Sequence, residues 1–222
     1  MPRGGGIKGL PPLSTTRVLP VAELIIVTGS PGVGKSSVSE ALSNLLGCEL
    51  IESSVFLRSV GALRLDPTGR SSEVVDERRA SESIKGFILG RSGCFVVSTL
   101  HPTLWLNGIQ EHVLFVVLLR CHPRVLIERL ESRGWGRAKV LENVLAESFN
   151  VIAEELLDYE DLVLEVDSSG KSLDEVVDEI LSKLELWDTG IRIDWLSLDP
   201  SLIEFVTKLV HELDLYKERL GV

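Results

Sequence analysis

Residues 24–36 read Leu-Ile-Ile-Val-Thr-Gly-Ser-Pro-Gly-Val-Gly-Lys-Ser, and this stretch decides the fold. Its first four residues form an apolar, mostly β-branched run, which is typical of a strand buried in a parallel sheet. The glycine-rich segment leads into residues 38–46, where apolar side chains recur at helical spacing, and Gly47 stands where a helix C-terminus favours glycine. The stretch therefore predicts a strand, a tight loop and a helix in direct succession.

The loop matches the pattern G-x-x-x-x-G-K-[ST] between Gly29 and Ser36. Glycines let the backbone curl so that successive N–H groups point at phosphate oxygens, and the N-terminus of the following helix adds its dipole. Lys35 is expected to reach the β- and γ-phosphates of ATP. The expected cofactor is Mg²⁺, which enters with ATP and binds the Ser36 hydroxyl. A glycine-rich turn without a ligand is the alternative, and the flanking strand and helix argue against it.

Further along the chain, apolar runs and apolar stripes alternate. The runs predict buried strands at residues 94–97, 113–119 and 162–166. The stripes predict helices over residues 125–133, 138–157, 173–184 and 202–213. The last helix needs a surface to pack on, either in this chain or on a partner. The alternation predicts an α/β fold with a parallel sheet flanked by helices.

The composition argues against several classes of protein. The 222 residues carry 23 Lys and Arg against 33 Asp and Glu, and a net charge of −10 repels a nucleic-acid backbone, so extensive direct nucleic-acid binding is not expected. The longest apolar run, residues 113–119, is too short to span a membrane. Residues 1–20 lack the continuous apolar stretch of a signal peptide, and we expect a flexible tail on a cytoplasmic protein.

The three cysteines, Cys48, Cys94 and Cys121, are far apart and form no C-x-x-C pair. Their odd number and spacing argue against a disulfide framework and against a zinc site. A chain of this length buries enough surface to fold without disulfides. We therefore expect a reducing environment, with the thiols packed as small apolar groups.

A second group of candidate residues lies on the predicted helix 125–133. Arg129 and Arg133 are four residues apart, so both guanidinium groups can converge on one ligand, and Gly134 and Gly136 can act as a hinge for the next segment. A mobile basic lid of this kind would spread the charge of a transferred phosphoryl group and exclude water. A solvated helix face with local ion pairs is the alternative, and the phosphate-binding loop favours the lid.

Taken together, these motifs resemble the adenylate kinase isoenzyme 6 type family. The resemblance runs from about residue 24 to residue 195 and is carried by residues 29–36, 74–77, 119–124, 128–135, 142–147 and 193–195. It implies a P-loop NTPase fold that transfers a phosphoryl group from ATP to AMP with broad tolerance for nucleoside monophosphates. It also implies a slow ATPase activity and a role in maturing the small ribosomal subunit through contact with one of its proteins.

Together with the lid argument, the resemblance assigns site residues by position. The ATP-binding residues are Gly32, Gly34, Lys35, Ser36, Ser37, Arg129 and Arg133, of which Lys35 and Arg133 are also the catalytic candidates. Residues 53–76 match the monophosphate-binding segment, in which Arg58, Arg64 or Arg70 is expected near the acceptor phosphate, and residues 132–142 match the lid. The expected organisation is a tail (1–22), a P-loop kinase domain (23–187) and a C-terminal amphipathic helical extension (188–222).

One position departs from the family pattern. The family ends its third strand with Asp-x-His, whereas residues 96–101 here read Val-Val-Ser-Thr-Leu-His. Ser98 therefore stands in place of the acid, and a hydroxyl supplies no negative charge to a metal ion. His101 lies one residue too far along, and a histidine held in a turn before Pro102 is its alternative interpretation. Either Asp76 or Glu77 substitutes for the missing carboxylate, or the metal is held loosely and turnover is weak.

The leading expectation is a broad-specificity nucleoside-monophosphate kinase that converts ATP and AMP to two ADP. A nucleotide-switched ribosome assembly factor with little turnover is one alternative, which the missing strand-end acid favours, and a P-loop kinase for another small metabolite is a second. A basic small-subunit ribosomal protein suits the charge of −10. The candidate acidic face for it, unless these residues are merely solvated, consists of Asp158, Glu160, Asp161, Glu165 and Asp167.

Overall fold

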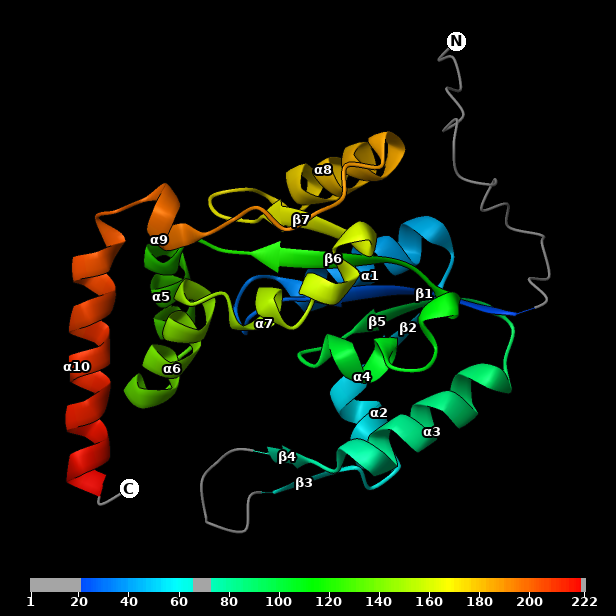
Figure 1. Ribbon diagram of the computed structural model, residues 1–222, viewed down its shortest axis with the longest axis horizontal. Helices are drawn as coiled ribbons and strands as arrows, with labels where there is room; N and C mark the ends of the chain where they lie inside the picture. Colours follow the sequence, from blue (N-terminus) through cyan, green and yellow to red (C-terminus); the bar gives the residue numbers. More distant parts are fainter. Residues whose placement is uncertain (1–20, 66–72, 221–222) are drawn as a thin grey trace.

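The computed structural model describes residues 21–65 and 73–220, and its centre is a five-stranded sheet. The strand order is β2-β5-β1-β6-β7, and every neighbouring pair is parallel. The strands are β1 (Ala22–Thr28), β2 (Glu49–Glu52), β5 (Gly93–Ser98), β6 (Val113–Arg120) and β7 (Val163–Asp167). The predicted parallel α/β fold is confirmed, and β1 occupies the middle of the sheet (Figure 1). The expected tail at residues 1–20 and Arg70 lie outside the described residues.

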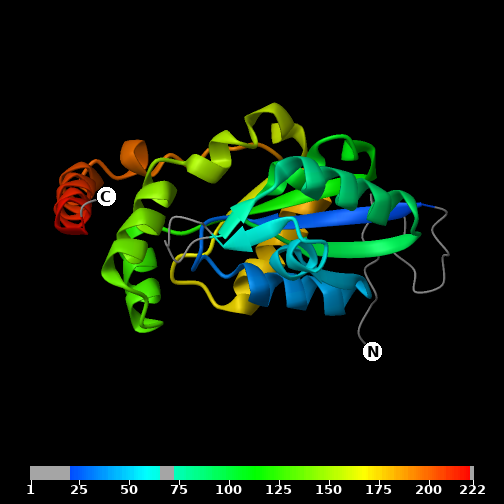
Figure 2. The same cartoon turned by 90° about the horizontal axis from the view of Figure 1, so that it is seen from below.

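Helices cover both faces of the sheet, as Figures 1 and 2 show together. On one face lie α1 (Lys35–Leu46) and α8 (Leu173–Leu186). On the other lie α3 (Glu77–Leu89), α4 (Pro102–Leu106) and α7 (Val151–Glu154). Beyond the carboxyl ends of the strands stand α5 (Pro123–Ser132) and α6 (Arg137–Ser148). Two short 3-10 helices, η1 (Gln110–His112) and η2 (Leu157–Leu162), precede β6 and β7.

The strand β1 divides its side chains between two cores. Ile25 and Val27 pack in the core shared with α1 and α8, whereas Leu24 and Ile26 pack in the core shared with α3 and α4. All four are fully buried, because successive residues of a strand point to opposite faces and helices cover both faces here. This explains why the first four residues of the stretch 24–36 are all apolar.

The segment between β2 and β5 contains strands that the sequence analysis did not predict. After β2 come α2 (Ser53–Ser59) and an antiparallel hairpin of β3 (Leu63–Leu65) and β4 (Glu73–Val75). Strands of three or four residues are too short to show a periodic pattern, so β2 and the hairpin are recognised only by their pairing.

The prediction of one helix over residues 138–157 is wrong. α6 ends at Ser148, α7 begins at Val151, and Asn150 between them adopts a left-handed backbone with φ of 59°. The Asn150 side chain accepts a hydrogen bond from Arg120 Nη2 (2.6 Å) and donates one to Asp194 Oδ1 (3.2 Å). The helix is therefore interrupted at an asparagine. This residue type tolerates a left-handed backbone, and its side chain accepts a hydrogen bond from the buried guanidinium group of Arg120.

The C-terminal helix packs on its own chain. After α9 (Trp195–Leu198), α10 (Leu202–Leu220) lies along the outer side of α6 (Figure 1). Its buried face, formed by Leu202, Val206, Leu209 and Leu213, joins the core that contains α6. This decides between the two surfaces that the sequence analysis left open. α10 also bonds to α6 through Arg137, whose Nε and Nη2 donate to the two carboxylate oxygens of Glu212, each at 2.7 Å.

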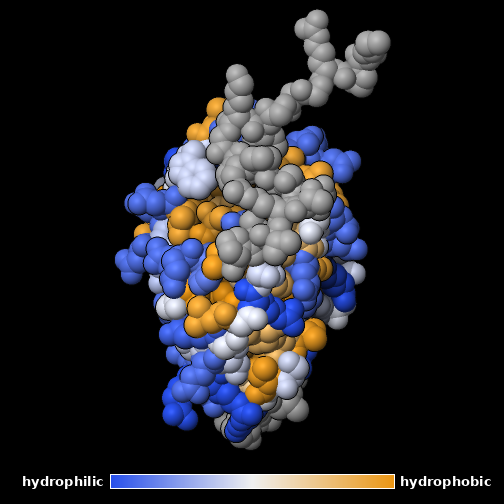
Figure 3. All heavy atoms as spheres, turned by 90° about the vertical axis from the view of Figure 1, so that its right-hand side faces the viewer, coloured by the Kyte–Doolittle hydropathy of each residue, from blue (hydrophilic) through white to orange (hydrophobic). Residues whose placement is uncertain are grey.

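The amino-terminal end of the sheet carries a mixed surface. On the side seen in Figure 3, outside the atoms drawn in grey, hydrophobic patches alternate with hydrophilic side chains. No helix in the described ranges is long and apolar enough to cross a bilayer.

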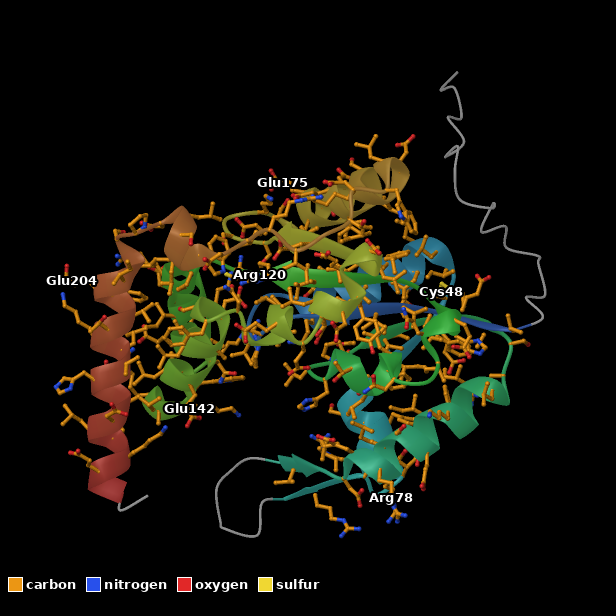
Figure 4. All side chains as sticks on the ribbon, viewed as in Figure 1. Cys48, Arg78, Arg120, Glu142, Glu175 and Glu204 are labelled. Carbon is orange, nitrogen blue, oxygen red and sulfur yellow. A yellow bond between two sulfur atoms is a disulfide. The ribbon has the colours of Figure 1, made fainter. Side chains whose placement is uncertain are left out.

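A disulfide joins Cys48 and Cys94, which corrects the expectation of three reduced cysteines. Cys48 immediately precedes β2, and Cys94 lies near the start of β5, at the end of the sheet where Figure 4 labels Cys48. Because β2 and β5 are parallel neighbours, the two Cα atoms are only 4.7 Å apart although 46 residues separate them in sequence. Cys121 is free and buried, and burial raises the pKa of its thiol to about 11, as expected of an inert packed cysteine.

Reduction of the disulfide should lower the free energy of unfolding by about 2–4 kcal/mol, because the crosslink restricts the unfolded chain across a long loop. Guanidinium unfolding followed by circular dichroism, with and without reductant, measures this change. Thiol titration in denaturant should give one free thiol before reduction and three after it. Three thiols before reduction would contradict the crosslink.

Candidate functional site

The loop between β1 and α1 has the backbone that a phosphate cradle requires. Gly29 and Gly32 have φ of 134° and 96°. A Cβ on Gly29 would lie 2.2 Å from the carbonyl oxygen of Leu119, and a Cβ on Gly32 would lie 2.8 Å from the side chains of Leu126 and Leu130. The loop is therefore pressed against β6 and α5, and only glycine fits at either position.

The ammonium group of Lys35 lies across this loop. Its Nζ donates hydrogen bonds to the carbonyl oxygens of Gly29 (2.8 Å) and Ser30 (3.0 Å). Burial lowers the pKa of Lys35 to about 8, and this desolvation outweighs the opposing effect of the nearby carboxylates of Glu147 and Glu52. Arg133 lowers the pKa further. Because the pKa of Lys35 lies close to neutral pH, an anionic ligand beside Nζ would stabilise the charged form of this side chain.

One cavity opens on the α8 side of the loop, with a volume of about 350 Å³, and we call it the nucleotide cavity. Arg129 and Arg133 both line it, as their spacing on one helix predicts. The Arg129 guanidinium donates to Oγ and to the carbonyl oxygen of Ser168 (3.1 and 2.7 Å), so it is fixed to the loop after β7. The lining residues are Gly32, Val33, Gly34, Ser37, Val38, Arg129, Ser132, Arg133, Ser168, Lys171, Ser172, Leu173 and Val176.

Ser168, Lys171, Ser172 and Leu173 also line this cavity, and the sequence analysis did not predict them as site residues. They follow β7, and in a parallel sheet the carboxyl ends of the strands meet at one edge, where ligands bind. The sequence therefore contained a signal for these site residues, because they directly follow the strand predicted at residues 162–166.

A second and larger cavity, with a volume of about 950 Å³, lies on the other side of the loop, and we call it the acceptor cavity. It is bordered by Lys35 and Ser36, by α2, by the end of β5, by α6 and by α10. Its lining residues are Pro31, Lys35, Ser36, Glu52, Ser53, Ser54, Leu57, Leu63, Ser98, Thr99, Leu100, His101, Trp135, Ala138, Lys139, Glu142, Asn143, Leu213, Tyr216 and Lys217. Residues of the loop and of the start of α1 therefore line two cavities, each large enough for a small molecule.

Glu52 is the carboxylate that the sequence analysis missed. It ends β2, pairs in register with Ser98 at the end of β5, and lines the acceptor cavity beside Lys35 and Ser36. Glu52 thus brings a negative charge to the carboxyl edge of the sheet, one strand away from the position where Ser98 lacks it. Hydroxyl and carboxylate oxygens are ligands that suit Mg²⁺ held mainly by phosphates and water, and Ser36 and Glu52 line the same cavity. Within the described ranges, no group of three or more His, Cys, Asp or Glu side chains could hold a metal by itself.

The acids proposed from the sequence as substitutes take other positions. Asp76 caps α3, where its carboxylate accepts a hydrogen bond from the backbone N–H of Arg79 (3.1 Å). Neither Asp76 nor Glu77 lines the acceptor cavity, whereas His101 does. Partial burial lowers the pKa of His101, and the charge of Glu77 opposes this shift. Of these two acids, Glu77 therefore acts on His101 by its charge and Asp76 has a structural role.

Of the three arginines expected near an acceptor phosphate, the two that the structure describes do not line the acceptor cavity. Arg58 lies on α2 and Arg64 on β3, both exposed, and neither lines the acceptor cavity. Arg70 lies outside the described residues. Their role in binding a monophosphate stays a prediction.

A buried ionic network supports the phosphate loop from behind. Glu147 accepts hydrogen bonds from Ser30 Oγ (2.7 Å), Arg120 Nε (2.9 Å) and Trp195 Nε1 (3.0 Å). Arg120, labelled at the centre of Figure 4, also donates to Glu165 Oε1 (2.7 Å). Glu165 is only 6% exposed, which removes it from the acidic face expected for a protein partner.

The strand order and the glycine loop, with a cavity on each side of it, define the fold of this chain as that of the P-loop kinases. Two solved kinases have the same architecture: a gluconokinase from Sinorhizobium meliloti 1021 (TM-score 0.52, 21% identity, 76% of this chain and 93% of that one) and a shikimate kinase from Acinetobacter baumannii in complex with shikimate (TM-score 0.51, 18% identity, 75% and 94%). Residues 25–150 match the family model described as AAA domain.

The chain belongs to the family of archaeal proteins named "Putative adenylate kinase". It is 37% identical over 176 residues to the protein of that name from Sulfurisphaera tokodaii, covering 79% of this chain and 87% of the relative. It is 36% identical over 190 residues to the one from Thermococcus gammatolerans, covering 82% of this chain and 98% of the relative. These relatives and the fold confirm the resemblance drawn from the motifs.

The lowered pKa of Lys35 predicts that affinity for ATP falls as the pH rises through about 8, because the free protein then loses the charge that attracts phosphate. Phosphate binding favours the protonated form, so proton uptake should accompany ATP binding at pH 9. Calorimetric titration in two buffers of different ionisation enthalpy measures this uptake. The control is Lys171→Ala, which removes a cation that lines the nucleotide cavity and should keep the uptake. An affinity for ATP that stays constant between pH 7 and pH 9 would contradict the prediction that Lys35 binds the phosphates.

Proposed function

We propose that the chain is a nucleoside-monophosphate kinase that converts ATP and AMP to two ADP and tolerates other monophosphates. The observation that carries this proposal is that the phosphate loop separates two cavities, one bordered by Arg129 and Arg133 and one bordered by α2 and the β5 end. In the proposed arrangement the nucleoside of ATP occupies the nucleotide cavity and the monophosphate occupies the acceptor cavity. The γ-phosphoryl group then lies at Lys35, between them.

In the proposed reaction, an oxygen of the acceptor phosphate attacks the γ-phosphorus of ATP, and the bond from this phosphorus to the oxygen that bridges it to the β-phosphorus breaks in line. The products are two nucleoside diphosphates, and no covalent enzyme intermediate is needed. Lys35 and Arg133 stabilise the negative charge on the transferred group, while the loop N–H groups hold the donor phosphates. Residues 132–142 act as the lid that excludes water, which keeps the slow ATPase reaction small.

Mg²⁺ would enter with ATP, and it would neutralise the phosphate oxygens that bear charge during transfer. Ser36 and Glu52 are the residues that would hold it, because both line the acceptor cavity together with Lys35 and both carry side-chain oxygens. Glu52 would thereby supply the charge that the family takes from the strand-end acid at the position of Ser98.

Lys35→Ala tests the proposed centre. The variant should fold, because Lys35 binds ligand and is not a core group, and its ADP formation from ATP plus AMP should fall at least about a hundredfold with weaker ATP binding. Coupled assays with and without AMP, together with circular dichroism, give the result. Turnover retained in this variant, or a wild-type rate that AMP does not accelerate, would overturn the proposal.

Glu52→Gln tests the metal assignment. Loss of the carboxylate should reduce the gain in ATP affinity that Mg²⁺ provides and raise the Mg²⁺ concentration for half-maximal activity several-fold. Calorimetric titration of ATP with and without Mg²⁺ measures the first effect directly. The matched control is Glu142→Gln, which removes a carboxylate from the α6 side of the same cavity (Figure 4) and should leave both values unchanged. Equal effects of the two variants would contradict a specific role of Glu52.

A second candidate function is a nucleotide-switched factor for small ribosomal subunit maturation in the cytoplasm. Ser98 at the end of β5 favours it, because weaker metal binding would slow turnover while nucleotide binding persists. Asp158, Glu160 and Asp161 on and around η2 are exposed and remain candidates for contact with a basic ribosomal protein. ATP hydrolysis that depends on such a protein and not on AMP would favour this candidate.

A third candidate is a kinase for another small metabolite, because a gluconokinase and a shikimate kinase share the fold. A panel of acceptors that includes sugars and shikimate alongside AMP separates it from the proposed function. Faster turnover of a non-nucleotide acceptor would favour it.

A further inference from the structure

The last helix of the chain borders the acceptor cavity. Leu213, Tyr216 and Lys217 of α10 line this cavity, across from the loop residues Lys35 and Ser36. They lie more than 170 residues beyond the phosphate loop, and the sequence analysis expected of α10 only that it packs somewhere. The described part of α10 thus combines a packing face with a face that meets the proposed substrate site.

Contacts with α6 hold α10 beside the cavity. Arg137, the first residue of α6, donates from Nε and Nη2 to the two oxygens of Glu212 at 2.7 Å each, and it also bonds to Glu131. Such a bidentate pair holds orientation as well as distance. Leu213 follows directly and is 7% exposed, and Tyr216 packs one turn later against the same core as Trp135 and Ala138. The Tyr216 ring is therefore held at the cavity and is not a free surface side chain.

The chemistry of this wall is aromatic and cationic. Trp135 and Tyr216 line the cavity on this side, as do Lys139 and Lys217, and Glu142 of α6 adds one carboxylate. Lys139 Nζ lies 4.4 Å from the centroid of the Trp135 ring, a cation–π contact that holds the charge at the same wall. Rings next to cations suit a planar base that carries a phosphate better than they suit a sugar or another polyol.

We propose that α10 forms the specificity wall of the acceptor site and that Tyr216 packs against the base of the acceptor nucleotide. This inference rests on the proposed function and deepens it, because it names the part of the chain that distinguishes a nucleoside monophosphate from a smaller phosphate acceptor. Tyr216 is a specificity-determining residue, and the phosphoryl transfer itself is left to Lys35 and Arg133.

The test compares Tyr216→Ala with Tyr216→Phe and with Leu215→Ala, a neighbouring exposed residue of α10 that does not line the cavity. Loss of the ring should raise KM for AMP about tenfold and leave KM for ATP within twofold, since base stacking on an aromatic ring commonly contributes one to two orders of magnitude in affinity. Tyr216→Phe and Leu215→Ala should keep the wild-type KM for AMP. Calorimetric titration with AMP alone should show the same loss for Tyr216→Ala without any turnover.

The outcomes separate this inference from the function on which it rests. A wild-type protein that neither binds nor phosphorylates AMP overturns both. AMP-dependent turnover in the wild type with an unchanged KM for AMP in Tyr216→Ala overturns only the role of α10. A parallel rise of KM for AMP and for ATP, or a loss that Tyr216→Phe shares, indicates a structural role and overturns it as well. If Tyr216→Ala fails to fold, Tyr216→Leu keeps an apolar side chain in its place, removes the ring, and carries the same expectations.

Discussion

The buried carboxylate of Glu147 is the constraint on which the site depends. Its oxygens receive hydrogen bonds from Ser30 in the phosphate loop, from Arg120 at the end of β6 and from Trp195 near the C-terminus. A buried ion pair that loses one partner costs about 3–5 kcal/mol, so these three distant segments must keep their relative positions for any of them to be satisfied. The loop that would hold triphosphate is thus tied to residues more than a hundred positions away.

The same carboxylate acts on the charge of the site. Lys35 is desolvated by the packed loop, and without Glu147 and Glu52 nearby its pKa would be lowered further. The glycines allow this packing, since side chains at Gly29 or Gly32 would strike β6 or α5. Lys35 therefore carries an ammonium group that is charged at neutral pH and poorly solvated. A cation in this state attracts an anion more strongly than a cation exposed to water.

Elements that follow the loop at long distance in the sequence complete the walls of both cavities. The loop after β7 closes the nucleotide cavity, and α6 with α10 closes the acceptor cavity. One fold can serve different acceptors when the site is built on variable parts of the chain, and the proposed function gives acceptor recognition to these walls. In this chain those walls depend on α10 lying against α6, which the Arg137–Glu212 pair secures.

The sequence by itself determined the strand, the loop and the helix of residues 24–36, because these follow from residues adjacent in the chain, and it predicts the phosphate chemistry of the loop. It also placed Arg129 and Arg133 on one cavity, since helical spacing alone brings them together. Only the tertiary structure decided the Cys48–Cys94 crosslink, the break at Asn150, the burial of Glu165 and the presence of Glu52 beside Lys35. Each of these depends on which distant strands or helices become neighbours, and a local pattern of apolar and polar residues records the periodicity of an element but not its partner.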